Sequence, residues 1–120
     1  MTFWILIVAG ILHLSFMVGE LLPWSVPVLL RMASKQLPKD KSFNEPQRRL
    51  VANLVHNAGV YNGIVGGGLL WSAFVGLPGA AVAQVMLIGA AVAGVFGTLT
   101  LKSPVPAVQA AIGIFGLFFV

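Results

Sequence analysis

The chain has 120 residues, of which 58% are hydrophobic and only 8% are charged, with a formal net charge of +4. Ordinary soluble domains carry about 25% charged residues, so this composition excludes a soluble domain and predicts an integral membrane protein. Cysteine is absent, which excludes disulfides, thiolate metal sites and cysteine nucleophiles. The basic residues gather almost entirely in one loop between apolar segments, a pattern typical of membrane orientation rather than nucleic-acid binding.

The first apolar segment predicts a membrane-spanning helix over residues 2–22. It has no basic start and no Ala-x-Ala cleavage site, so we expect a retained helix and not a signal peptide. His13 and Glu20 are seven residues apart in this segment. That spacing puts them on nearly the same helix face, about 10.5 Å apart along the axis.

Residues 24–44 mix basic and apolar side chains and are interrupted by prolines. This pattern predicts a cytoplasmic loop that contains a short helix lying on the membrane surface. Asn44, Pro46 and Gln47 then supply an N-cap, a first-turn proline and a capping-box partner. These signals predict a second spanning helix over residues 46–74.

The second predicted spanning helix carries five strongly polar side chains: Asn53, His56, Asn57, Tyr61 and Asn62. At 100° per residue the first three share one broad face, while Tyr61 lies at its edge and Asn62 points roughly the opposite way. Most of the polarity of this helix is therefore expected to face one neighbour.

Two further apolar segments predict helices over residues 79–101 and 104–120, the last with Ser103 as its N-cap and Pro104 in its first turn. Small residues recur at four-residue spacing in the second and third spanning helices, which predicts close helix packing. These residues are Gly59, Gly63, Gly67, Gly89, Ala93 and Gly97. We expect the two ladders to face each other.

The four predicted helices indicate an all-α, integral membrane four-helix bundle that forms a single transmembrane domain. The basic residues all lie in or beside the first and third loops; they are Arg31, Lys35, Lys39, Lys41, Arg48, Arg49 and Lys102. The positive-inside rule then predicts both termini outside and the basic first loop in the cytoplasm. The expected location is the bacterial inner membrane, which the chain would cross several times.

Polar side chains from all four predicted helices fall at similar depths, which predicts a small polar cavity that opens toward the cytoplasmic leaflet. The candidate ligand-binding residues are His13, Glu20, Asn53, His56, Asn57, Tyr61 and Gln109. The alternative is that the amides, histidines and hydroxyls only make hydrogen bonds between helices, each worth about 0.6 to 2 kcal/mol. An intramembrane carboxylate indicates function by default, but Glu20 is also close enough to the interface to pair with Arg48, Arg49 or a loop lysine.

Three runs of residues form a recognisable combination: His13-x6-Glu20-x3-Trp24, then Asn57-Ala-Gly-Val-Tyr-Asn-Gly63 with Gly68-Leu-Leu-Trp71, then Ala93-Gly-Val-Phe-Gly-Thr-Leu-Thr-Leu-Lys102 with Gln109. Together they resemble the small bacterial four-helix membrane proteins of domain-of-unknown-function family thirteen hundred and four. Ala58 stands where that family usually has glutamine, so a site that used this glutamine would need another group here, such as His56, or would lack it. The resemblance implies a four-helix inner-membrane protein and transfers no activity.

Three functions are compatible with these patterns. The first is binding or transport of a small polar or lipid-like molecule through the inner-leaflet cavity, with transport requiring a homodimer because one four-helix chain is small for alternating access. The second is an accessory subunit that packs against a larger membrane complex. The third and weakest is a haem- or metal-dependent enzyme, which rests on His13 and His56 lying on different helices and has no supporting motif.

No catalytic or metal-ligating residue is assigned, and the identity of any cofactor is left open. The expected partners are the lipid bilayer and either a second copy of the chain or a larger membrane complex, with no nucleic acid.

Overall fold

A computed structural model describes residues 1–35, 37–38, 41–101 and 104–120 of the chain. These residues form helices joined by turns and loops, with no strand among them, which confirms the all-α prediction. The elements are α1 (Thr2–Leu21), α2 (Ser25–Ser34), α3 (Glu45–Val75), the 3-10 turn η1 (Leu77–Gly79), α4 (Ala80–Leu101) and α5 (Pro104–Leu117). The basic residues Lys39 and Lys102 and the predicted N-cap Ser103 lie outside the described residues.

Among the described residues, three segments are long and apolar enough to cross a membrane: α1 with 20 residues, α3 with 31 and Leu77–Leu101 with 25. The chain therefore has the helices of a membrane protein. The fourth apolar helix, α5, has only 14 residues and ends at Leu117, whereas the sequence predicted a helix to residue 120. Its last turn is tightened by bonds from the Phe118 and Phe119 amides to carbonyls three residues earlier.

The start of α3 is defined by side chains, as the sequence predicted. The Asn44 side chain accepts a hydrogen bond from the Gln47 amide at 3.0 Å, and the Gln47 side chain accepts one from the Asn44 amide at 3.0 Å. This confirms the predicted capping box, which satisfies amides that have no partner inside the helix.

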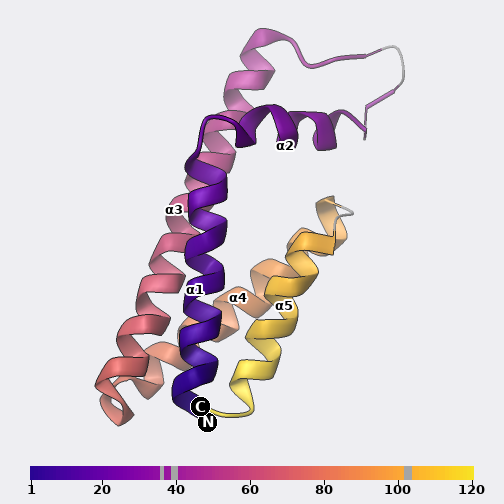
Figure 1. The fold of residues 1–120 in the computed structure, drawn as a ribbon. Coiled ribbons are helices and arrows are strands. Elements are labelled where there is room, and N and C mark those ends of the chain that lie inside the picture. The colour runs from indigo at the N-terminus through magenta and orange to yellow at the C-terminus, as the bar shows by residue number, and fades with distance from the viewer. Residues whose placement is uncertain (36, 39–40, 102–103) are drawn as a thin grey trace.

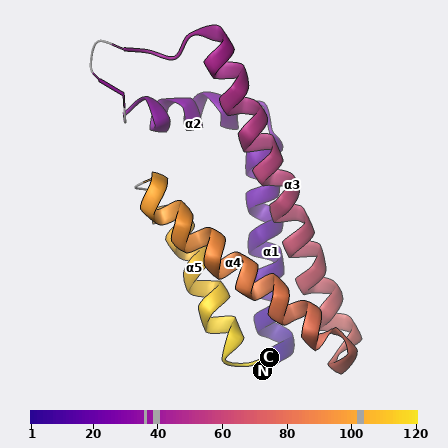
Figure 2. The ribbon, with the colours of Figure 1, turned by 180° about the vertical axis from the view of Figure 1, so that it is seen from behind.

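The helices form two antiparallel pairs, α1 with α3 and α4 with α5 (Figures 1 and 2). The pairs meet at the end of the molecule where both termini lie, and diverge toward the opposite end, where α2 turns away from α1 (Figure 1). The arrangement thus differs from a four-helix bundle packed along its whole length.

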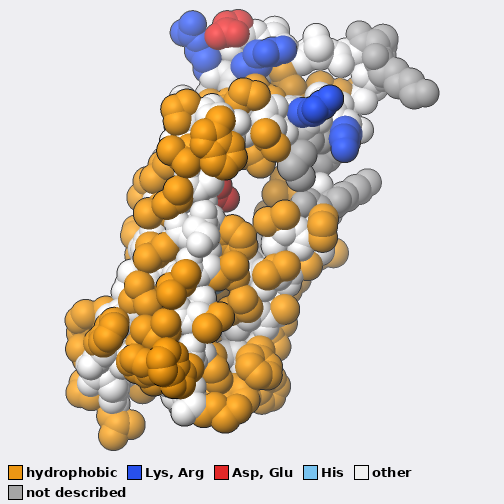
Figure 3. All heavy atoms as spheres, viewed as in Figure 1, with side chains coloured by type: hydrophobic (Ala, Val, Ile, Leu, Met, Phe, Trp, Pro, Cys, Tyr) orange, Lys and Arg blue, Asp and Glu red, His pale blue; other side chains and the backbone are white. Residues whose placement is uncertain are grey.

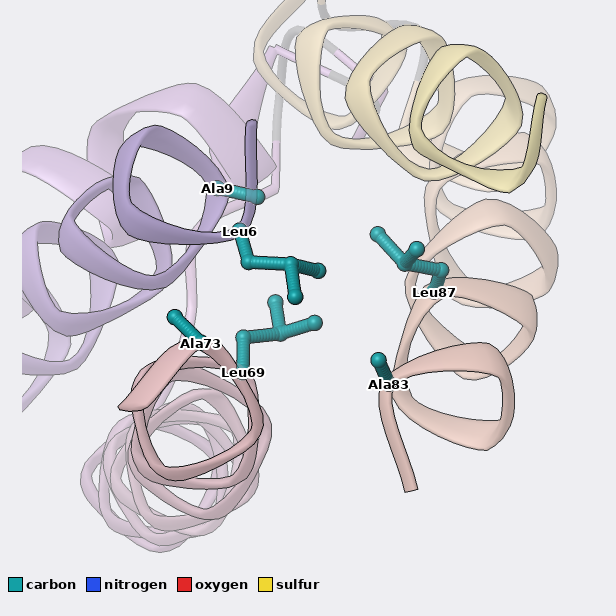
Figure 4. Close-up of a cluster of buried hydrophobic side chains, with 6 residues drawn as sticks. All are labelled: Leu6, Ala9, Leu69, Ala73, Ala83 and Leu87. Carbon is teal, nitrogen blue, oxygen red and sulfur yellow. The ribbon is translucent and has the colours of Figure 1, made fainter. Parts of the chain in front are cut away.

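The two pairs are joined by a buried apolar cluster near the termini (Figure 4). Leu6 and Ala9 come from α1, Leu69 and Ala73 from α3, and Ala83 and Leu87 from α4. Beside it, the Thr2 hydroxyl donates a hydrogen bond to the Phe119 carbonyl at 2.7 Å, which ties the two ends of the chain together.

The two glycine ladders do not face each other, contrary to the sequence-based expectation. Gly59 and Gly63 pack against α1: a Cβ at Gly59 would lie 3.1 Å from Glu20 Cβ, and one at Gly63 would lie 2.6 Å from Met17 Sδ. Gly97 packs against Pro106 of α5. Gly67 and Gly89 have no atom within 4 Å of a Cβ position, and Ala93 is exposed.

The physical reason is that a small-residue spacing marks where another backbone can approach but does not identify that backbone. The closest approaches involve glycines outside the predicted ladders. A Cβ at Gly66 would lie 2.8 Å from the Gly10 carbonyl oxygen of α1, and one at Gly113 would lie 2.8 Å from the Leu87 carbonyl oxygen of α4.

Candidate functional site

A hydrogen bond between Glu20 and Asn62 joins α1 to α3 inside the apolar part of the molecule. Glu20 lies in the last turn of α1, and its Oε2 accepts a bond from Asn62 Nδ2 at 2.8 Å. Both residues are half-buried. Asn62 points away from the face that carries Asn53 and Asn57, as helical periodicity predicts, and it is the asparagine that meets α1.

The Glu20 carboxylate has a neutral amide as its partner and not a cation. In the described part of the chain the ion pair is instead Arg49 Nε with Glu45 Oε1 at 3.2 Å, on the exposed first turns of α3. The structure therefore gives no support to pairing of Glu20 with Arg48 or Arg49. A carboxylate within an apolar helix and without a counter-ion is energetically costly, which marks Glu20 as a functional candidate.

His13 is fully buried on the same side of α1 as Glu20, two helical turns nearer the N-terminus. Its Nδ1 lies 2.8 Å from the Ala9 carbonyl oxygen. A carbonyl only accepts, so Nδ1 is the protonated nitrogen, and Nε2 of the neutral ring is an acceptor. This Nε2 is buried and has no hydrogen-bond partner among the described residues.

His56 also has a buried Nε2 without a described partner, but it lies at a different level. Gly66 of α3 lies opposite Gly10 and Leu14, and therefore at the level of His13. Ten residues of helix separate Gly66 from His56, or about 15 Å. One metal ion or haem cannot be reached by both rings, and the described residues contain no group of three or more metal-ligating side chains.

The remaining candidate residues of α3 point outward. Asn53, Asn57 and Tyr61 are exposed, Tyr61 by 68%, so the structure does not bring them together with Glu20 and His13. The cause is that α3 turns its smallest residues, Gly59, Gly63 and Gly66, toward α1, and this rotation directs the asparagine face away. Gln109 is half-buried on α5.

Figure 3 shows an opening between the two helix pairs just below α2, with acidic atoms at its wall. Glu20 lies where α1 ends before α2, at this end of the molecule. The groups available here are the Glu20 carboxylate, which accepts one hydrogen bond from an amide, and His13 Nε2, an acceptor without a described partner two helical turns away. Both groups would bind a ligand that donates hydrogen bonds or carries positive charge.

The outward face of α3 forms a continuous seam. Its exposed residues follow one another at alternating spacings of three and four; they are Leu50, Asn53, Asn57, Val60, Ile64, Gly67, Trp71 and Phe74. This is the heptad spacing by which one helix packs along another. The sequence identified this face but assigned it to the interior of the same chain.

Comparison with known families matches residues 7–120 to the family described as "Protein of unknown function (DUF1304)". No curated protein and no solved structure matches the chain. The matched region includes the described helices apart from the first residues of α1, and it contains His13, Glu20 and Asn62. The family that the sequence motifs resemble is thereby confirmed, and the chain belongs to the DUF1304 family.

Proposed function

We propose that this protein resides in the bacterial inner membrane and binds a small amphipathic molecule, with an amino or hydroxyl head group, against Glu20 in the opening between its helix pairs. The ligand enters from the cytoplasmic leaflet, at the end of the molecule that carries α2. Transport is a further step that would need a second copy of the chain.

The orientation follows from the positions of charge and of the termini. Arg31, Lys35, Lys41, Arg48 and Arg49 all belong to α2, to the loop after it, or to the first turns of α3, and are exposed. This end opposes the termini, which supports a cytoplasmic α2 and external termini. The bond between Thr2 and Phe119 supports termini on the same side. That requires an even number of crossings, so α5 crosses as the fourth helix although it is only about 21 Å long.

The single observation that carries the proposal is the Glu20 carboxylate, which shares one neutral hydrogen bond with Asn62 and has no described cation beside it. One of its oxygens is available to a ligand. His13 Nε2 is a second acceptor without a described partner on the same side of α1, about 10.5 Å away. The head group of the ligand would donate to the free oxygen of Glu20, and His13 Nε2 would remain for a second donor group further along the ligand.

The test is native mass spectrometry of the protein extracted from its own membrane in mild detergent, with dodecylamine, dodecanol and dodecanoate as added probes. We expect the wild-type protein to bind dodecylamine or dodecanol in preference to dodecanoate, and Glu20→Gln to reduce the binding of dodecylamine about tenfold or more. The matched control is Glu45→Gln, because Glu45 is an exposed acid paired with Arg49 at the surface. Equal binding by both variants and the wild type would contradict the proposal.

A second candidate role is structural, and the α3 seam favours it. Asn53, Asn57 and Tyr61 are polar side chains on the outside of an apolar spanning helix, where lipid offers no hydrogen bonds. We assign the covering helix to α3 of a second copy of this chain. Two copies share the same membrane orientation, so a two-fold axis along the membrane normal brings each asparagine next to its equivalent in the other copy. Because an amide is both donor and acceptor, the two equivalent asparagines can hydrogen-bond to each other.

Asn57→Leu is expected to decrease the dimer fraction in mild detergent, because interhelical amide hydrogen bonds contribute about 0.6 to 2 kcal/mol. Ser15→Leu is the control, since Ser15 is exposed on α1 and bonds to its own helix at Ile11. A monomer in the wild-type sample would refute the self-association. Isolation of the chain with different membrane subunits would assign the seam to a larger complex instead.

A further inference from the structure

A second hollow lies at the basic end of the molecule, between α2 and the start of α3, apart from the opening at Glu20. It has a volume of about 350 Å³. Its polar lining consists of Arg31 and Ser34 from α2, Ser42 from the following loop and Arg48 from the first turns of α3. Pro27, Leu30 and Phe43 supply the apolar part of the lining.

Two cations from different helices line this one hollow, and their charges are not neutralised by a described carboxylate. Arg48 uses its Nε to donate to the Phe43 carbonyl at 3.2 Å, which leaves its terminal nitrogens available. Arg49, the next residue, differs because it is paired with Glu45. Like charges in one hollow repel each other, so an anion between them would be stabilised by both.

The hydroxyl groups and the backbone complete the set of potential contacts. The Ser34 hydroxyl donates to the Arg31 carbonyl at 2.9 Å, which keeps its oxygen close to Arg31 with lone pairs free and its position defined. Ser42, in the loop that leads to α3, also lines the hollow. Guanidinium groups bind phosphate oxygens through two parallel hydrogen bonds, a geometry that a lysine cannot provide.

We propose that this hollow binds a phosphate group, with Arg31 and Arg48 as the anchoring residues and the apolar lining in contact with the organic part of the ligand. The same chemistry is presented by an anionic phospholipid head group and by a free phosphate ester. The basic end lies at head-group level in the orientation argued above, where hollows between helices take phospholipid head groups. The site uses none of the groups at Glu20, so a failure of ligand binding at Glu20 leaves it unaffected. Only its placement at head-group level rests on the membrane orientation proposed above.

The test measures binding of phosphatidylglycerol by native mass spectrometry of the full chain in mild detergent. Phosphatidylcholine is the comparison lipid, because it is zwitterionic and the choline group neutralises its phosphate. Each of Arg31→Gln and Arg48→Gln is expected to weaken phosphatidylglycerol binding about tenfold or more, because each removes charge-assisted hydrogen bonds. Arg49→Gln removes the same charge one residue further along and is expected to change binding less than about threefold.

Arg48→Lys distinguishes a specific phosphate site from nonspecific charge attraction, since it keeps the positive charge and loses the planar guanidinium group. We expect it to bind more weakly than the wild type. The proposal is overturned if Arg49→Gln weakens binding as much as Arg31→Gln and Arg48→Gln. It is also overturned if Arg48→Lys binds like the wild type, or if the wild type does not distinguish the two lipids.

The source of the phosphate is decided by competition in the same samples. Displacement of phosphatidylglycerol by millimolar glycerol 3-phosphate assigns the site to a soluble phosphate ester. Retention of the lipid under these conditions assigns it to the membrane. Circular dichroism of each variant verifies that its helices are intact, and all four variants change exposed side chains that the helix core does not need.

Discussion

Gly94 is the position at which one added methyl group should disturb the molecule most clearly. A Cβ there would lie 2.7 Å from both Ala110 Cα and the Pro106 carbonyl oxygen, and closer still to the Ala110 amide nitrogen. These are backbone atoms of α5, so no side-chain rotation can relieve the contact. To restore ordinary contact at 3.4 Å, α5 must retreat by at least about 0.7 Å from α4.

Gly89→Ala is the matched control, because Gly89 is five residues away on the same helix and has no atom within 4 Å of its Cβ position. The higher helix propensity of alanine acts equally in both variants and cancels between them. The difference in unfolding free energy then reports the contact alone. Overpacking of this kind costs about 1 to 3 kcal/mol, with Gly94→Ala the less stable variant.

The assay is unfolding by sodium dodecyl sulfate in mild detergent micelles, followed by circular dichroism. Gly94→Ala should lose helicity at a clearly lower denaturant fraction than Gly89→Ala, and Gly89→Ala should match or exceed the wild type. Indistinguishable curves for the two variants would refute the close α4–α5 approach on which the reasoning rests.

Two further predictions concern the polar groups that hold α3. Asn62→Ala leaves the Glu20 carboxylate without its amide donor and should lower the unfolding free energy by about 1 to 3 kcal/mol in the same assay. Its control is Ser15→Ala, which removes an exposed hydroxyl and should change the unfolding free energy little. Equal effects of the two variants would exclude an energetically important bond between Asn62 and Glu20. Asn44→Ala removes the cap of α3 at a cost of about 1 kcal/mol, and hydrogen exchange of the Gln47 amide should accelerate about fivefold. An unchanged exchange rate would mean that the cap contributes nothing to stability.

The local elements of this protein were predictable because their causes are local. Asn44 and Gln47 cap α3 through atoms three residues apart, and prolines and turn residues separate the other helices. The long apolar runs indicated a membrane protein because water-exposed helices of that composition would not be soluble. The isolated carboxylate of Glu20 was conspicuous in the sequence for the same reason.

The partner of each helix was not predictable from these patterns. Periodicity gives the angle between Asn62 and Asn57 on α3 but not the direction in which α1 lies. In water the apolar face of a helix would identify its buried side, but in a membrane both lipid and neighbouring helices are apolar, so this signal is lost. Three of the five strongly polar side chains in the spanning part of α3, Asn53, Asn57 and Tyr61, therefore suggested an inward-facing surface, and the structure leaves all three exposed.

By itself the sequence determined that the chain is helical, apolar, capped at Asn44 and a member of its family, since these properties depend on composition and on neighbours along the chain. Only the tertiary structure decided that α1 pairs with α3 and α4 with α5, and hence that Asn62 is the partner of Glu20. The physical reason is close packing: the helices come together where glycines such as Gly66 and Gly94 let two backbones touch. That contact fixes the rotation of each helix about its axis, and the rotation determines which side chains face the neighbouring helix.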